Sequence, residues 1–142
     1  MSQYYDMGDR TLWNPSNGAS RLFISQVSFW QAELGLPSGI GPMQSDECQI
    51  DPLVFKVFID ALLAWHRRTS HAVTAALSEG FVATVLVLAD RAGIEPQWPP
   101  TVLPEGAGLA EVQVPRSPHR SEDAWAAALR QKSRDLGRFM PA

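Results

Sequence analysis

The stretch DPLVFKVFIDALLAWHRRT, residues 51–69, decides the fold. Asp51 can cap a helix, and Pro52 fits the first helical position, where its missing N–H costs nothing. The apolar residues that follow cover most sides of this helix and leave only a narrow polar strip. The basic residues at its end suit the negative end of the helix dipole. We therefore predict a helix from Pro52 to about Thr69, in the middle of the fold.

Two more helices should pack around it. Apolar spacing predicts one over residues 17–34 and another over residues 71–92, followed by Gly35 and Gly93 respectively, as expected of helix ends. Residues 82–88 are rich in β-branched side chains and could instead form a buried strand. We favour the helix because its periodicity begins before that run.

The remaining segments add a small sheet and a tail. Residues 3–7 and 10–13 have strand-forming side chains around a Gly-Asp turn, which predicts a hairpin, and the alternation over residues 110–114 could add a strand to it. We expect residues 36–50 to form a loop. The fold class is thus α+β and mainly helical, with a three-helix core, an antiparallel N-terminal hairpin sheet and a C-terminal helix on a Pro-rich arm.

Length and composition narrow the choices. With 142 residues, 45% of them hydrophobic and 19% charged, the chain suits one globular core. We divide it into a helical unit with the hairpin over residues 1–94, a Pro-rich linker over 95–120, and an amphipathic helix over 121–142. The apolar runs are too short to span a membrane and no signal peptide is recognisable, so we expect a cytoplasmic protein.

Charge is unevenly distributed. The net charge of the chain is −3, with residues 1–115 acidic and residues 116–142 basic. This asymmetry favours docking of the tail on the body or on an acidic partner, and it lacks the large basic face that nucleic-acid binding requires. We therefore expect neither a nucleic-acid partner nor a membrane partner.

One loop gathers candidate chemistry. Asp46, Glu47 and Cys48 with Asp51 could bind a cation or supply acid and base groups, but the pattern of a calcium loop is missing. The alternative is a solvated loop whose Asp51 caps the next helix. Cys48 could be a nucleophile if a helix N-terminus or a histidine lowered its pKa, although a small buried thiol is commoner.

The histidines and aromatic residues supply the other candidates. His66, with His71 and His119, forms no recognisable metal spacing, so we expect no metal site and no cofactor. Trp13, Trp98 and Trp125 could join the hairpin, linker and tail to the body or face a partner. Asn14 lies beside Trp13, where the hairpin meets the first helix, and it serves either a turn or a ligand.

Five strings carry a resemblance: LWNPSN, GLPSGIGPM, SDECQID, RRTSHAV and EGFVATVLVLA. Over residues 2 to about 94 the chain resembles a family of small uncharacterised actinobacterial proteins, known only as a domain of unknown function. The resemblance implies that these residues form one unit, and it supplies no activity.

No motif of a known enzyme class is present, so we predict a non-enzymatic protein-interaction factor of accessory, regulatory or toxin-neutralising (immunity) type. The first alternative is a small enzyme or a binder of a small apolar ligand. Its pocket would be walled by Trp13, Trp30 and Trp65, with polar groups from Asn14, Asp46, Glu47 and His66. The second alternative is self-association, in which the basic tail of one copy docks on the acidic body of another.

Overall fold

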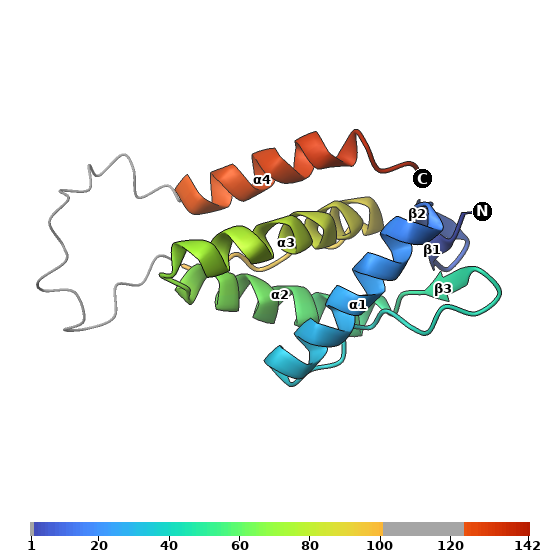
Figure 1. Cartoon of the computed structure of the whole chain (residues 1–142), viewed down its shortest axis with the longest axis horizontal. Coiled ribbons are helices and arrows are strands. Elements are labelled where there is room, and N and C mark those ends of the chain that lie inside the picture. Colours follow the sequence, from blue (N-terminus) through green and yellow to red (C-terminus); the bar gives the residue numbers. More distant parts are fainter. Residues whose placement is uncertain (1, 101–123) are drawn as a thin grey trace, which may run out of the picture.

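The computed structural model describes residues 2–100 and 124–142 and has the predicted mainly helical α+β architecture. Its helices are α1 (Asn17–Leu34), α2 (Pro52–Arg68), α3 (Ala72–Ala92) and α4 (Ala124–Gly137), and its strands are β1 (Tyr4–Met7), β2 (Arg10–Trp13) and β3 (Glu47–Gln49). In Figure 1, α2 and α3 lie together, α1 crosses them, and α4 runs along α3. The sheet lies at one end, beside both termini.

The helices begin and end where the sequence predicts. The Asp51 carboxylate accepts hydrogen bonds from the backbone N–H groups of Leu53 and Val54, at 3.0 and 3.2 Å, which confirms it as the α2 cap. Gly35 follows α1 in the left-handed conformation with φ of 67°. Residues 82–88 are helical, so the strand alternative for them is wrong. The predicted start of the last helix at Ser121 lies outside the described residues.

The sheet is mixed, although we expected an antiparallel one. β1 and β2 form the predicted antiparallel hairpin, and β3 adds to β1 in parallel, so the order is β2-β1-β3. β3 comes from residues 36–50, which we expected to be loop throughout. The possible strand over residues 110–114 lies outside the described residues.

The core is aromatic and continuous from the sheet to the helices. The Tyr5 ring stacks on Trp13 with centroids 5.3 Å apart, and both rings contact Phe23 of α1 edge-on. Phe81 of α3 in turn stacks on Phe23 and on Trp30, at 5.6 and 5.9 Å. Because aromatic pairs fix ring orientation as well as bury area, this column sets where α1 crosses α3.

The C-terminal segment is docked on the body. Ala126 and Leu129 of α4 are buried, and Lys132 Nζ lies 3.2 Å from Glu79 Oε1 of α3. Arg91 of α3 donates to the carbonyl oxygens of three residues (Leu12 at 2.8 Å, Gly137 at 3.0 Å and Met140 at 2.7 Å). One guanidinium thus joins α3, the end of β2 and the chain end.

One helix in the described ranges, Ala72–Ala92, is long and apolar enough to cross a membrane by length and composition, with a mean hydropathy of 1.9. Half of this stretch is buried inside the fold. A helix buried in a protein core has the same composition, so α3 alone does not distinguish a membrane environment from a protein core.

Candidate functional site

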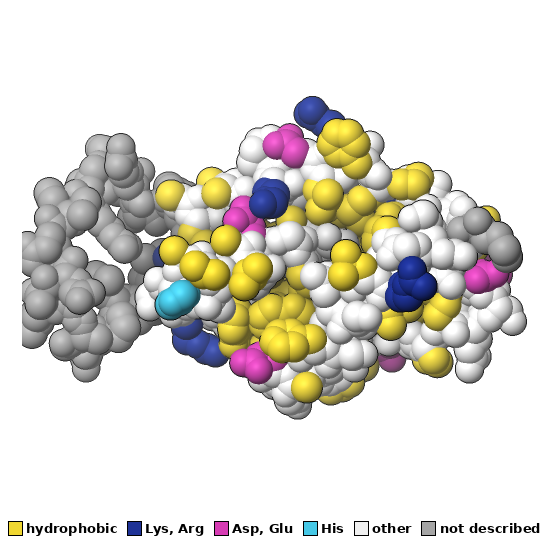
Figure 2. Space-filling view, viewed as in Figure 1, with side chains coloured by type: hydrophobic (Ala, Val, Ile, Leu, Met, Phe, Trp, Pro, Cys, Tyr) yellow, Lys and Arg dark blue, Asp and Glu magenta, His cyan; other side chains and the backbone are white. Residues whose placement is uncertain are grey.

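An open apolar groove of about 440 Å³ lies between α1, α2 and α3. Its apolar lining consists of Phe29 and Trp30 of α1, Trp65 of α2 and Leu77 of α3, and we call it the apolar groove. Ser25, Gln26, Glu33, Thr74 and Ser78 complete its lining. Figure 2 shows hydrophobic side chains gathered around a hollow where α1 crosses the other two helices.

The groove has a fixed floor and prominent edges. Trp30 is buried and packs edge-to-face against Trp65, with ring centroids 4.7 Å apart. Phe29 contacts Trp30 at 5.1 Å yet remains 58% exposed, and Leu77 on the opposite edge is 78% exposed. Large apolar side chains exposed around a concave surface are typical of binding sites.

The polar side chains of the groove leave it chemically apolar. Ser25 Oγ donates to the Arg21 carbonyl at 3.0 Å, and Ser78 Oγ donates to the Thr74 carbonyl at 2.8 Å, so both hydroxyl protons are used inside their own helices. Thr74 Oγ1 lies 3.3 Å from His71 Nδ1. Glu33 is the one charged residue of the lining in the described part of the chain.

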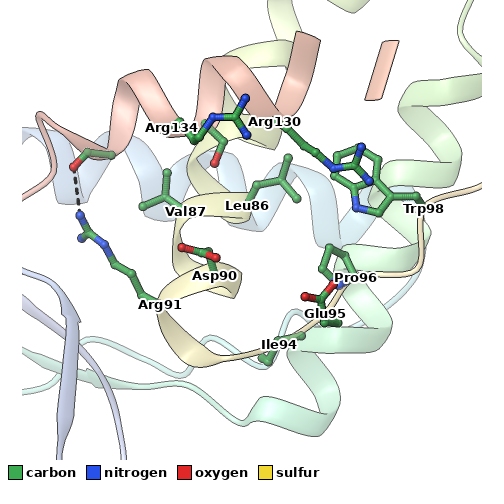
Figure 3. Close-up of a pocket in the computed structure, with 12 residues that line it drawn as sticks. Leu86, Val87, Asp90, Arg91, Ile94, Glu95, Pro96, Trp98, Arg130 and Arg134 are labelled. Atoms are coloured by element: carbon green, nitrogen blue, oxygen red, sulfur yellow. Dashed lines mark hydrogen bonds between the residues drawn. The ribbon is translucent and has the colours of Figure 1, made fainter. Parts of the chain in front are cut away.

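A second cleft, of about 480 Å³, lies between α3, residues 94–98 and α4. Figure 3 shows Arg130 and Arg134 of α4 on one side and Asp90 and Glu95 on the other. Arg130 stacks 4.3 Å over the Trp98 ring, and Arg134 bonds its helix neighbour Gln131. Within residues 2–100 and 124–142 no ion pair joins the two sides of this cleft.

His66, Trp98 and Trp125 come together at one end of α4. Trp125 Nε1 donates to His66 Nδ1 at 2.8 Å, which assigns the ring proton of His66 to Nε2, 3.3 Å from the Ala75 carbonyl. Trp98 packs against the edge of Trp125 at 5.7 Å, and the Arg67 guanidinium lies 5.0 Å over Trp125. This cluster fastens α4 to α2, and both ring nitrogens of His66 are occupied.

Asp46, Glu47 and Cys48 lie at the edge of the sheet and form no common site. Asp46 Oδ1 accepts from Gln3 at 3.2 Å, and Glu47 is exposed. The Cys48 thiol is buried 3.1 Å from the Gly41 carbonyl, and burial raises its pKa to about 11. A thiol with this pKa is protonated at neutral pH, which argues against a nucleophile.

Trp13 and Asn14 are part of the packing at the sheet end. Trp13 is buried, and the Asn14 backbone N–H donates to the Pro141 carbonyl at 2.7 Å. The side-chain oxygen of Asn14 is buried and has no hydrogen-bond partner among the described residues. This oxygen therefore does not bond its own turn.

The candidates named from the sequence thus fall into three separate groups, of which only the cluster of His66, Trp98 and Trp125 joins residues far apart in the sequence. The described residues contain no group of three or more His, Cys, Asp or Glu side chains that could hold a metal ion, and His119 lies outside those residues. Sequence reasoning did not propose Phe29 and Leu77, which edge the apolar groove. The available signal was the unusual width of the α1 apolar stripe, which Leu22 and Phe29 extend beyond the buried face.

Comparison with known proteins supplies a family without an activity. A family model described as "Family of unknown function (DUF6086)" matches residues 1–142. The match extends beyond residues 2–94, which carry the resemblance seen in the sequence. No curated protein and no solved structure matches the chain.

Proposed function

We propose that this chain, which belongs to the DUF6086 family of unknown function, is a non-enzymatic protein-interaction factor that binds its partner through the apolar groove. The observation that carries the proposal is the pair of exposed edges, Phe29 and Leu77, beside a floor formed by the packed Trp30–Trp65 pair. Large apolar side chains that are exposed around a concave surface are typical of protein-interaction sites.

The arrangement of polar groups supports this class over an enzyme. The aromatic pocket proposed as an alternative needs Asn14, Asp46, Glu47 and His66 near Trp13 and Trp30. Trp30 and Trp65 do line the apolar groove, but Trp13 packs into the core elsewhere, and none of the four polar residues belongs to the lining. Among the described residues its lining offers one carboxylate, Glu33, and one hydroxyl next to a histidine, Thr74. That histidine, His71, caps α3 by accepting from the Thr74 backbone N–H, which gives the pair a structural role.

The docking of α4 bears on the self-association alternative. Basic α4 packs on α3 of its own chain, with the Lys132–Glu79 ion pair, so our proposal needs no exchange of tails between copies. The finer form of the proposal is a cytoplasmic accessory, regulatory or toxin-neutralising protein of an actinobacterium. Its support is the sequence resemblance and the acidic body.

Capture from the native cell with matched variants tests the proposal. Wild type, Phe29→Ser, Leu77→Ser and Leu53→Ser are compared by quantitative mass spectrometry. Leu53 is 80% exposed on α2 and does not line the groove, so it controls for general surface hydrophobicity. We expect at least one protein to be enriched by wild type and Leu53→Ser and lost with both groove variants. If every captured protein ignores the groove variants, the proposal is wrong.

A further inference from the structure

The apolar groove also indicates the chemistry of its occupant, an inference that rests on the proposed function. Its α1 wall runs from Ser25 to Glu33. At the 1.5 Å rise of an α-helix this wall is about 12 Å long, which matches about two helical turns. A partner segment of two to three turns would therefore fill it.

The walls favour a helical occupant over an extended one. All three walls are α-helices, whose backbone groups bond within their own helix, so the groove offers no sheet edge to a peptide strand. The hydroxyl protons of Ser25 and Ser78 are already donated to carbonyls of their own helices. An extended segment would leave its amides without partners here, whereas a helix satisfies its own.

The charge of the groove further limits the kind of segment that can bind in it. Glu33 is the only charged lining residue among the described residues, and it lies at the C-terminal end of the α1 wall. Residues 2–100 carry six Lys and Arg against ten Asp and Glu, and the docked residues 124–142 carry four against one, so the described residues together have a net charge of −1. A cationic segment is therefore attracted by the carboxylate at the groove more than by the overall charge of the protein.

We infer that the apolar groove binds an amphipathic helix of a partner protein, with bulky apolar residues at i, i+3 or i+4 and i+7 against Phe29, Trp65 and Leu77, and a Lys or Arg facing Glu33. This is the helix-in-groove mode of recognition, in which apolar anchors supply the affinity. The charge contact sets the direction of the helix and selects against acidic partners.

Two synthetic probes test the inference on the full chain. One is a labelled Leu/Lys amphipathic peptide of about 14 residues, long enough for a marginal helix in water. The other is its twin with Glu at every Lys position. Fluorescence anisotropy should show tighter binding of the Leu/Lys peptide, and Phe29→Ser and Leu77→Ser should each weaken it by about tenfold, since each removes an apolar anchor.

Charge variants distinguish the effect of the Glu33 carboxylate from the effect of the overall charge of the protein. Glu33→Gln should weaken the Leu/Lys peptide by about threefold, as expected for a partly exposed ion pair. Asp9→Asn removes the same charge at the β1–β2 turn and should change the binding much less. Glu33→Lys should favour the Glu twin. Equal effects of Glu33→Gln and Asp9→Asn would overturn the charge pairing.

The remaining outcomes distinguish this inference from the proposed function. If neither peptide depends on Phe29 and Leu77 while the capture experiment finds a groove-dependent partner, the helical occupant is wrong and the proposed function stands. If wild type is a dimer by light scattering and Leu77→Ser is a monomer, the occupant is a second copy and the inference is overturned. The apolar dye ANS provides a last comparison. If ANS binds to wild type and is lost with the groove variants, while neither peptide binds, the helical occupant is wrong and a small apolar ligand is favoured.

Discussion

Replacement of Arg91 by Met should destabilise the protein strongly although Arg91 lies outside the apolar groove. The guanidinium donates to the carbonyls of Leu12, Gly137 and Met140 at 2.7 to 3.0 Å. A hydrogen bond to a charged group contributes about 1.5–3 kcal/mol. The three bonds share one partly buried cation and water can replace part of each, so we expect a total loss of about 3 kcal/mol. Met keeps the aliphatic packing, so the loss reports the bonds.

Thermal and urea unfolding followed by circular dichroism measure this change. For a chain of this length, about 3 kcal/mol corresponds to a fall in Tm of about 10 °C. Arg134→Met is the matched control, because exposed Arg134 bonds only Gln131 of its own helix among the described residues. This replacement should change stability by no more than about 0.5 kcal/mol. The Asn14 amide, bonded to Pro141, should also exchange faster in Arg91→Met. Equal Tm values for the two variants would refute the reasoning.

Three other changes test the fold. Gly39→Ala should cost about 3 kcal/mol or more in urea unfolding, because φ is +80° and the new Cβ would lie 2.7 Å from the Asp51 carbonyl oxygen and from the Phe55 backbone nitrogen. Gly8→Ala, with φ of +62° and open space around the new Cβ, should cost about 1 kcal/mol. Trp125→Phe should lose about 1 kcal/mol because His66 Nδ1 loses its donor, and a double-mutant cycle with His66→Ala should recover that coupling. Cys48 has a pKa of about 11 against an ordinary 9.0, so its stabilising contribution is complete below pH 9 and is lost as pH rises towards 11. When the free energy of unfolding is measured against pH, Cys48→Ala should reduce its fall between pH 9 and 11. Native Cys48 should also react with iodoacetamide far more slowly at pH 8 than the same thiol in the unfolded chain. Equal rates would contradict its burial.

The helices were predictable because their signals are local. The Asp51-Pro52 pair, the glycines after α1 and α3, and the apolar spacing all act within a few residues, and the structure confirms each. β3 was not predictable because its three residues show too little alternation, and it is stabilised by pairing with β1, about forty residues earlier in the chain. The sheet is mixed because β3 pairs in parallel with β1, and this pairing depends on contacts between residues far apart in the sequence.

The candidate site was less predictable than the fold. Sequence reasoning selected Cys48 and His66 for the chemistry of their side chains, and burial and hydrogen bonds then gave both a structural role. It overlooked Phe29 and Leu77 because an apolar residue in a helical stripe is expected in the core. The angle at which helices cross decides which residues of a wide apolar stripe are covered by a neighbouring helix. The spacing of apolar residues within one helix does not predict that angle.

The contacts of α1 with α3 explain why the groove stays open. Phe81 of α3 stacks on both Phe23 and Trp30 of α1, but Leu77, one turn earlier on α3, remains 78% exposed. Phe81 thus contacts α1, whereas Leu77 is left largely uncovered. Moving α1 to cover Leu77 would disturb the Trp30–Trp65 pair, and close-packed aromatic contacts resist such a shift. The groove is thus set by the core itself, and a partner helix would meet a surface that is already formed.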